Sequence, residues 1–443
     1  MRKKIIWKKS LAFCLILCLL LSTLSGCSFE KEEQQSEALI ALEGAVNYYK
    51  TQNNLNNWEE LVALCAANQA DGIGIGWSFL NLPKTPKVNE YASSYIGVIL
   101  SDTIKGEGDP ISLAKKLSET QNEESGSFDS IYINQHVWAM ITLNVAISKD
   151  GYDYDKAVSY LLSYQAEDGG FAYGQNLAEG NVDLTGIACI ALAPYYEKHK
   201  KDPTMKKIIQ FFKDKQLETG GFENGDVENP CTIAAAIWGL SAFEQPLPAT
   251  DEGLTPFEAL VAFQNEDGSF RMKKDGEHKF DNLATRQSTI ALCDIVNDIN
   301  TYLLLASDAE TYRIEHISGP AITLTIDYPE GSGQQDVHGP FTIEEGSTVL
   351  DAIVLYGKIT ETPIEHKSGN LKSINGFSEE PSEPIETPND PPKNSVGWNF
   401  TVNDQIPENN AKNTVLKEGD LLTWTFIPSS PLEAQEEENT TVQ

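Results

Sequence analysis

The chain has 443 residues, which is enough for two or three domains with separate hydrophobic cores. Its 33 basic and 65 acidic side chains give a formal net charge of −32, so binding to nucleic acid or to an anionic membrane face is disfavoured. With 40% hydrophobic and 9% aromatic residues, the chain has too much apolar material to be mostly disordered. The seven cysteines form no CxxC pair and no Cys/His cluster with zinc spacing, so the sequence predicts neither a disulfide scaffold nor a metal site.

The N-terminal segment predicts export and lipid attachment. Basic residues without any acid precede the apolar run Leu11–Leu21, which is short for a membrane span. The following Leu24-Ser25-Gly26-Cys27 resembles a bacterial lipobox, which implies a signal peptide at 1–26 and diacylglycerol on Cys27. We expect a hydrophilic spacer at 27–36 and an extracytoplasmic location, with the membrane contacted only through this lipid. A simple secretory signal, or an anchor helix with an incidental cysteine, is the alternative.

A short pattern recurs through the middle of the chain. It reads Gln-Ala-Glu-Asp-Gly-Gly-Phe at 165–171 and is repeated at 216–222 and 264–270, with a longer copy at 121–128. Each copy follows an amphipathic stretch and precedes one that is apolar nearly all round. This pattern predicts helical hairpins in which an outer helix packs on an inner helix. The glycines end the first helix, and the phenylalanine fills the space between hairpins.

Repeated hairpins of this kind form either an open solenoid or a closed ring. Further helices are expected early in the chain, at Leu39–Tyr49, Trp58–Asn68 and Tyr91–Leu100. The Gln-x-x-Asp-Gly-Gly-Phe turns resemble the repeats of the terpenoid-cyclase and protein-prenyltransferase α/α toroid, a superfamily that includes cobalamin carriers of the transcobalamin type. This resemblance implies a closed toroid over residues 37–308.

The helical period ends near Tyr312, and a second domain with a different pattern follows. Alternating β-branched residues predict strands, and one amphipathic run predicts a short helix. The elements expected are strands at Ala321–Tyr328, Gly397–Asn403 and Leu421–Ile427, a helix at Thr348–Tyr356, a proline-rich mobile insertion at 378–393 and an acidic tail at 429–443.

The order of these pieces resembles the transcobalamin-like C-terminal domain over residues 313–428. That resemblance implies a small α+β unit with a β-grasp-like sheet. The predicted fold class is therefore mainly α: an α/α toroid of repeated helical hairpins, followed by a small α+β (β-grasp-like) domain. In the animal cobalamin carriers, which share this arrangement, the corrinoid is held between the two domains.

Residues for catalysis by the known toroid enzymes are not found. A polyene cyclase needs a clustered Asp-x-Asp-Asp, and the nearest match, Asp153-Tyr154-Asp155-Lys156, is expected to be a solvated helix cap. A protein prenyltransferase needs an Asp, Cys and His set for zinc, and Cys231 lacks those partners in the sequence. We therefore predict no catalytic residue, no required cofactor and no metal.

Polar residues gather where the predicted inner helices begin, and those ends would surround one mouth of a toroid. Taken singly, each of these residues could be a helix cap, but together they suit a large neutral ligand that bears amide groups, such as a corrinoid. The candidate ligand-binding residues of the toroid are Asn134, Gln135, His136, Asp183, Thr185, Asn229, Thr232, Asn282, Thr285 and Gln287.

Other candidates have an ordinary structural explanation beside the functional one. Trp398 and Asn403 of the second domain are added to the site, although Trp398 and Trp424 could equally lie in that domain's own core. Tyr132, Trp138, Tyr173 and Trp238 could line the toroid but fill a core by default. Cys189, Cys231 and Cys293 are expected to be small buried hydrophobes.

The predicted function is a lipid-anchored extracellular binding protein that holds cobalamin or a related corrinoid between the toroid and the C-terminal domain and delivers it to an uptake transporter. One alternative is a toroid enzyme, terpenoid-like or a glycan lyase or hydrolase, with His136 and nearby tyrosines or acids as acid/base groups. The other is a cell-surface scaffold whose acidic exterior binds a protein or wall polymer. A toroid filled by its own side chains would favour the scaffold.

Overall fold

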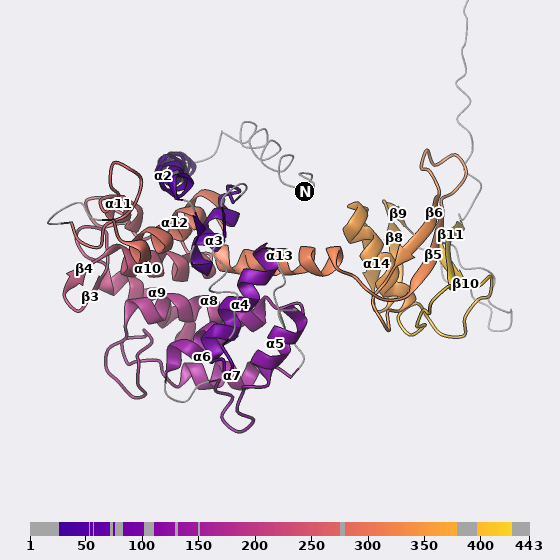
Figure 1. Cartoon of the computed structure of the whole chain (residues 1–443), viewed down its shortest axis with the longest axis horizontal. Helices are drawn as coiled ribbons and strands as arrows, with labels where there is room; N and C mark the ends of the chain where they lie inside the picture. The colour runs from indigo at the N-terminus through magenta and orange to yellow at the C-terminus, as the bar shows by residue number, and fades with distance from the viewer. Residues whose placement is uncertain are drawn as a thin grey trace, which may run out of the picture. The chain divides into compact units, whose positions relative to one another are not determined.

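The computed structural model describes residues 26–52, 54–55, 57–70, 74–75, 83–101, 110–128, 132–148, 151–274, 280–378 and 397–427 (Figure 1). It divides into two compact units, Met1–Tyr312 and Arg313–Gln443. The predicted signal peptide, the acidic tail and nearly all of the proline-rich insertion lie outside the described residues. Within the described ranges, no single helix is long and apolar enough to cross a membrane, and one bent helix pair passes that test only when taken together.

The first unit is a closed ring of paired helices (Figure 1). In the inner layer each helix packs on the next, and the last packs on the first, so the toroid is closed and the expectation of this fold class is confirmed. The inner helices are α3 (Trp58–Ala66), α4 (Val88–Ser101), α6 (Ile133–Asn144), α8 (Val182–His199), α10 (Pro230–Ala242) and α12 (Asn282–Asn297). The outer helices are α2 (Gly26–Thr51), α5 (Pro110–Ser118), α7 (Tyr154–Leu162), α9 (Pro203–Lys215) and α11 (Pro256–Val261).

Sequence pattern separates the two layers. The outer helix α9 buries one apolar stripe, including Ile208 and Phe212, and exposes lysines on its other face. The inner helix α10 is buried almost all round, because helices flank it on several sides. Inner helices α8 and α10 also approach very closely at Gly186, where an added Cβ would lie 2.5 Å from the carbonyl carbon of Ala235. Only glycine fits this crossing without moving a backbone.

The glutamine of each repeat turn ties its own turn to the next hairpin. The Nε2 atom of Gln165 donates to the Gly169 carbonyl at 2.9 Å and to the Thr204 carbonyl, in the first turn of α9, at 3.3 Å. Gln216 repeats this arrangement with the carbonyls of Gly220 and Pro248, at 3.0 and 2.9 Å. The recurrence of the glutamine in the pattern therefore has a structural reason, since one amide side chain bonds to two successive hairpins.

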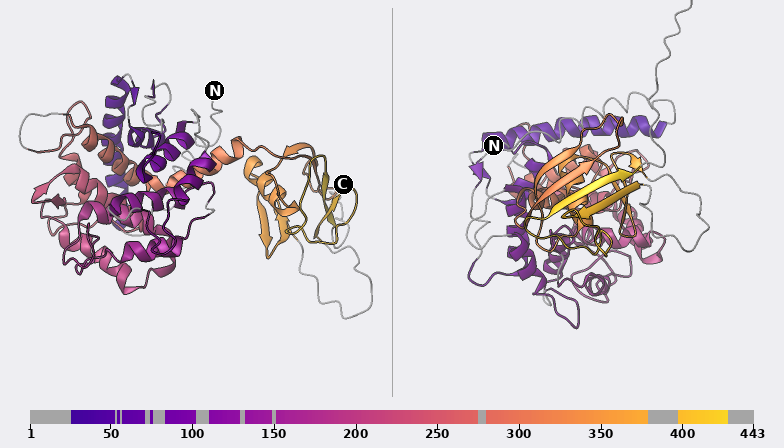
Figure 2. Two further views of the ribbon diagram at one scale, coloured as in Figure 1. Left: turned by 60° about the horizontal axis from the view of Figure 1, so that its bottom comes forward. Right: turned by 90° about the vertical axis from the view of Figure 1, so that its right-hand side faces the viewer.

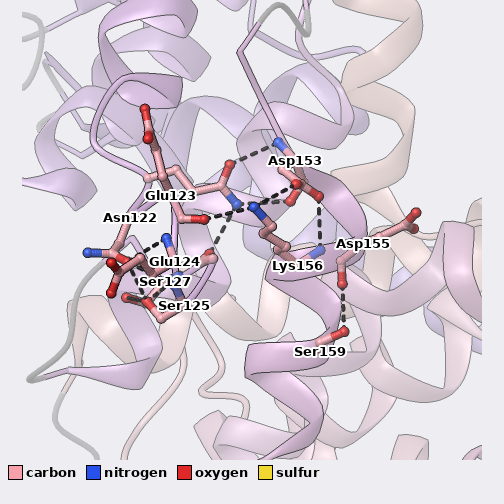
Figure 3. A network of polar contacts seen from close by, with 11 residues as sticks. Asn122, Glu123, Glu124, Ser125, Ser127, Asp153, Asp155, Lys156 and Ser159 are labelled. Atoms are coloured by element: carbon pink, nitrogen blue, oxygen red, sulfur yellow. Dashed lines mark hydrogen bonds and ion pairs between the residues drawn. The ribbon is translucent and has the colours of Figure 1, made fainter.

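Figure 3 shows the first of these turns against α7. The Gln121 side chain donates to the Asp153 carbonyl at 2.9 Å, and the Lys156 ammonium donates to the Glu123 carbonyl at 2.7 Å. The Asp153 carboxylate caps α7 by accepting the Lys156 backbone N–H at 3.0 Å. The prediction that this acidic segment is a helix cap is confirmed.

The ring closes between its first and last hairpins. In the last repeat, Gln264 donates to the carbonyl of Ala41 in α2 at 2.8 Å, across 223 residues of sequence. The Gln34 side chain, also on α2, donates to the hydroxyl of Thr255 at the start of α11, at 2.8 Å. Helix α2 begins at Gly26, so the segment 27–36, which was expected to be a spacer, is helical, and its residues Gln34 and Gln35 bond to the toroid.

The first unit also contains two short pairs of strands. They are the parallel pair β1 (Asn54–Leu55) with β2 (Gly74–Ile75) and the hairpin β3 (Glu223–Asn224) with β4 (Val227–Glu228). Helix α13 (Thr301–Glu315) follows α12 after a bend of 82°. Asp298 takes a left-handed conformation at this corner, with φ 55°.

The second unit is an α+β domain with a mixed sheet in the order β10-β11-β5-β6 (Figure 2). The central strands β5 and β11 are parallel, and the edge strands are antiparallel to them, which is a β-grasp-like arrangement. A separate three-stranded meander consists of β7, β8 and β9. The elements are β5 (Ala321–Asp327), β6 (Val337–Thr342), α14 (Val349–Thr360), β7 (Ile364–Lys367), β8 (Asn370–Ile374), β9 (Phe377–Ser378), β10 (Gly397–Val402) and β11 (Leu421–Ile427).

Candidate functional site

In three inner helices, the side chain of the fourth residue bonds to a repeat turn and so identifies the helix face that points toward that turn. The Thr185 hydroxyl accepts the Phe171 backbone N–H at 2.8 Å, and the Thr285 hydroxyl accepts that of Phe270 at 2.9 Å. In α6 the same position is His136, whose Nδ1 accepts the backbone N–H of Phe128 at 3.2 Å. The fourth residue therefore faces the repeat turn, away from the centre of the ring.

This geometry corrects the predicted roles of four residues. The side chains of His136, Thr185, Thr232 and Thr285 are fully buried at 0% exposure, and the Thr232 hydroxyl donates to the side chain of the helix cap Asn229. Because they bond to the turns and caps, they do not face a ligand. The Asn229 side chain itself accepts the Thr232 backbone N–H at 3.0 Å, as a helix cap does.

His136 is neutral in this position. Burial lowers its pKa to about 4, and a backbone hydrogen bond to Ala157 offsets part of that shift. Since Nδ1 accepts from Phe128, the hydrogen is assigned to Nε2, which donates to the Ala157 carbonyl at 3.1 Å. Both ring nitrogens are used within the wall, so His136 has no free nitrogen for a metal or for acid/base chemistry.

The same register identifies the residues that face the lumen. Each helical residue advances by about 100°, so positions two before and two after the fourth residue lie on the opposite face. We call the second residues the rim and the sixth residues the wall. On α3, α6, α8, α10 and α12 the rim residues are Glu59, Asn134, Asp183, Cys231 and Leu283, and on α6, α8, α10 and α12 the wall residues are Trp138, Ile187, Ala235 and Gln287.

Solvent reaches the lumen as far as the wall. Asn134 and Leu283 on the rim are exposed, and Trp138, Ile187 and Gln287 on the wall are half-buried. One turn deeper, the ninth residues of α6, α8, α10 and α12 are buried, with exposures of 1% or less. They are Ile141, Ile190, Trp238 and Ile290. Exposure therefore falls from the rim through the wall to the buried ninth residues.

Aromatic rings close the lower end. Tyr302, at the start of α13, packs edge-on against Trp138 and Trp238, with centroids 5.3 and 5.4 Å away, and lies 6.3 Å from Trp58. We call these four residues the floor. Within the described part of the chain, the Trp238 Nε1 has no hydrogen-bond partner. Burial raises the pKa of Tyr302, and the nearby Glu59 carboxylate raises it further.

Charges on the rim are mostly paired. The Glu59 carboxylate meets Arg286 Nε at 2.5 Å, and the Glu60 carboxylate accepts from Asn282 at 2.6 Å. These bonds join α3 to α12, so Asn282 strengthens the ring where it closes. Asp183 accepts from Asn224 through Oδ2 at 2.6 Å, but its buried Oδ1 has no partner among the described residues.

Cys231 lies on this acidic rim. Its sulfur is 4.0 Å from that of Met272. Burial raises the pKa of the thiol to about 12, with Asp281 and Asp183 acting in the same direction and Arg286 opposing them. The thiol is therefore protonated at neutral pH.

Several exposed apolar residues lie where the chain enters the inner helices, and we call them the collar. They lie on the segments that lead into α6, α8, α10 and α12, or at the start of those helices. The collar consists of Tyr132, Tyr173, Leu177, Val227, Phe280 and Leu283, with exposures of 59%, 60%, 47%, 46%, 44% and 37%. Large side chains exposed together around a polar opening are typical of a binding surface.

The remaining predicted residues have varied positions. The half-buried Gln135 lies beside the rim, and its Oε1 has no partner among the described residues. In the second unit, Trp398 is buried in the core and donates to the Phe377 carbonyl at 2.7 Å, while Asn403 fixes the β10–β11 connection by bonding Asp420 at 2.8 Å. Trp398 and Asn403 therefore have structural roles, which corrects their assignment as ligand contacts.

Several lumen residues were not expected from the sequence. Glu59, Ile187 and Tyr302 carry no motif, and Cys231 was expected only to fill a core. A signal was present, because aligning the inner helices on the residue that receives the repeat phenylalanine gives the rim and wall directly. Among the described residues, no group of three His, Cys, Asp or Glu side chains could hold a metal ion.

The second unit has a hollow of its own, with a volume of about 370 Å³ beside the start of α14. Arg313 and Lys358 line it together with Glu344, Glu345 and Asp351. The Arg313 guanidinium pairs with Glu344 at 2.6 Å. This mixed, self-paired set of charges offers no single-sign site for an ion.

Comparison with protein families supports the architecture. The model for the prenyltransferase alpha-alpha toroid domain matches residues 37–228 and 196–313, which together are more than half of the chain. The chain belongs to this toroid family. Residues 346–427 match a second model, a domain of unknown function, DUF4430. No curated protein matches the sequence.

Solved structures with a related fold include both binding proteins and enzymes. Haptocorrin in complex with Cbi is 13% identical, with 88% of this chain and 98% of that chain covered and a TM-score of 0.35. Protein geranylgeranyltransferase-I of Candida albicans is 14% identical, with 68% and 97% covered and a TM-score of 0.39. A glycosyl hydrolase family 88 protein of Bacteroides vulgatus is 12% identical, with 60% and 99% covered and a TM-score of 0.39. These values assign no activity.

Proposed function

We propose that this toroid binds a large, uncharged, amide-bearing ligand at its open end, and that the ligand is cobalamin or a related corrinoid. The observation that carries the proposal is the set of lumen-facing side chains. Trp138, Ile187 and Gln287 of the wall are half-buried, and above them Asp183 on the rim and Gln135 beside it have acceptor atoms with no partner among the described residues. Those acceptors suit N–H donors of a ligand. The apolar collar suits the flat, apolar faces of a large macrocyclic ligand.

The arrangement favours binding over bond chemistry. Glu59 and Glu60 on the rim are held by Arg286 and Asn282, and His136 is bonded on both nitrogens inside the wall. An acid/base pair needs two titratable groups that converge on a substrate atom. Among the rim and wall residues, the titratable groups are the Glu59 and Asp183 carboxylates and the Cys231 thiol, and the others are amide, aliphatic or aromatic. The order of motifs in the second unit, which resembles the transcobalamin-like domain, supports the choice of a corrinoid.

Cyanocobalamin tests this proposal directly. The mature chain from Cys27, produced without lipid, should retain about one equivalent of corrinoid after desalting, with a Kd in the nanomolar to micromolar range. Visible absorbance of the desalted protein measures the retained ligand. Bovine albumin at the same concentration controls for non-specific carry-over. Absence of retained corrinoid at micromolar concentrations would remove this ligand.

We further propose that Cys27 carries the lipid that tethers the protein outside the cytoplasm, where it hands the ligand to an uptake transporter. The support is the sequence of the N-terminal segment, in which a basic stretch and an apolar run precede Leu24-Ser25-Gly26-Cys27. Cys27→Ser should abolish incorporation of an alkyne-labelled fatty acid in a bacterial host, whereas Cys65→Ser should not change it. Equal labelling of both variants would contradict the assignment.

A further inference from the structure

The corner between α12 and α13 contains a buried carboxylate. Asp294 is 2% exposed and lies two turns below Gln287 on the lumen side of α12. Its Oδ1 accepts the Thr301 backbone N–H at 2.7 Å, and its Oδ2 accepts from the Asn300 side chain at 3.1 Å. Ser241 of α10 contributes a third hydrogen bond. One carboxylate therefore joins α12, α10 and the first turn of α13.

The same corner sets the position of the lumen floor. Asn300 donates to the carbonyl of Trp238 at 3.0 Å and accepts the backbone N–H of Leu303 at 3.2 Å, so it caps α13 while bonding to α10. Tyr302 is the next residue but one, and its ring contacts three tryptophans of the inner helices. Any shift of the α13 start therefore moves the ring that closes the lumen.

We propose that Asp294 is a positioning residue that holds Tyr302 in the lumen floor, and that its protonation alters the floor and the affinity for the ligand. The claim about affinity rests on the proposed function, whereas the claim about the floor does not. The ionised carboxylate accepts from three donors at once. When one oxygen carries a hydrogen, that oxygen becomes a donor, and the bonds that specify the corner weaken.

The surroundings place this change near neutral pH. Burial raises the pKa of Asp294 to about 7, although the bonds from Thr301, Ser241 and Asn300 oppose that shift. The titratable or charged groups nearby are the Cys293 thiol on α12, Tyr302 on α13, and Glu59 and Arg286 around Tyr302. Because the folded pKa is raised, stability from this group is present at low pH and is lost as pH rises toward 7. Protonation therefore changes the hydrogen bonds that the corner makes, while the chain stays folded.

Intrinsic tryptophan fluorescence of the mature chain, titrated from about pH 5 to about pH 9, tests the first claim. The wild type should show a transition with a midpoint near 7. Asp294→Asn should lose that transition while keeping the wild-type circular dichroism spectrum. Ser241→Ala, which removes one donor to the carboxylate, should keep the transition and raise its midpoint. Identical titrations for wild type and both variants would overturn the assignment.

Cyanocobalamin affinity, measured at both ends of the same pH range, tests the second claim. We expect roughly tenfold weaker binding at the acidic end for the wild type and a pH-independent Kd for Asp294→Asn. Binding that is equally tight at both ends in the wild type would refute the link between the floor and the ligand. If no corrinoid binds at any pH but the fluorescence transition depends on Asp294, the ligand is wrong and the positioning role stands.

Discussion

Gly186→Ala should prevent the toroid from reaching a stable fold. In an ordinary helix this change stabilises by about 1 kcal/mol, because alanine has the higher helix propensity. Here the added Cβ would lie 2.5 Å from the carbonyl carbon of Ala235 and closer still to its oxygen, so the crossing of α8 and α10 must open. We expect a loss of more than about 3 kcal/mol in the free energy of unfolding, measured by urea denaturation followed by circular dichroism.

Gly174→Ala is the matched control. It lies in the loop before α8, and an added Cβ there would meet only the side chain of Leu177, at 3.4 Å. The control should change the free energy of unfolding by less than about 0.5 kcal/mol. If Gly186→Ala unfolds at the same urea concentration as this control, the close packing of the inner helices is not as described.

Trp138→Ala should reduce cyanocobalamin affinity by about 100-fold. Trp138 is the largest side chain of the wall, is half-buried, and touches both Trp58 and Tyr302. Large aromatic side chains at the centre of a site dominate binding energy, and truncation of one typically costs 2 kcal/mol or more, on the order of this fold-change. Isothermal titration calorimetry with cyanocobalamin gives the affinity, and tyrosine and tryptophan near-UV dichroism reports the floor.

A conservative variant separates loss of the site from loss of the fold. Trp138→Phe keeps a ring between Trp58 and Tyr302, so we expect wild-type melting and at most about tenfold weaker binding. A folded Trp138→Ala protein with undiminished corrinoid affinity would show that the ligand does not use the lumen. Weak binding by every variant and by the wild type would instead count against the ligand's identity.

Closure of the ring could not be read from the repeat pattern. The spacing of the Gln-x-x-Asp-Gly-Gly-Phe turns establishes paired helices, because it depends on local periodicity and turn chemistry. A closed ring depends on a few contacts between distant segments, such as the bonds from Gln264 to Ala41 and from Arg286 to Glu59. Neither pair has a signature in the sequence. The prediction of a closed ring came from the resemblance to the toroid superfamily, and the structure shows the contacts that close it.

The candidate site shows why residue type alone misplaces a binding residue. Polar residues at the start of a helix satisfy free backbone N–H groups or face outward, depending on position. A step of one residue turns a side chain by about 100°, so Thr185 packs on the repeat turn while Asp183 faces the lumen. Tyr302 was missed for another reason: it enters the lumen from α13, outside the repeats.

The second unit was predicted unevenly. Strands β5, β10 and β11 were expected because they alternate in β-branched and aromatic residues, and the sheet contains them. The meander of β7, β8 and β9 was missed, since Ile364–Lys367 carries mostly exposed polar side chains and Phe377–Ser378 is only two residues long. Such strands have no apolar period, and turns such as that at Ser368, with φ 53°, define them instead.

The hydrogen bond from Gln264 to Ala41 joins the last repeat of the toroid to its first helix, and this affects the order in which the ring folds. Helix α2 is the first helix of the ring to leave the ribosome, yet partners on α11 and α12 follow more than 200 residues later. Contacts between residues so far apart in the sequence form late in folding, because closing a long loop costs entropy. The ring therefore closes only after its last hairpin has formed. Deletion of α2 would therefore leave an apolar gap in the ring instead of a shortened end. We expect helix α2 of a second molecule to fill that gap.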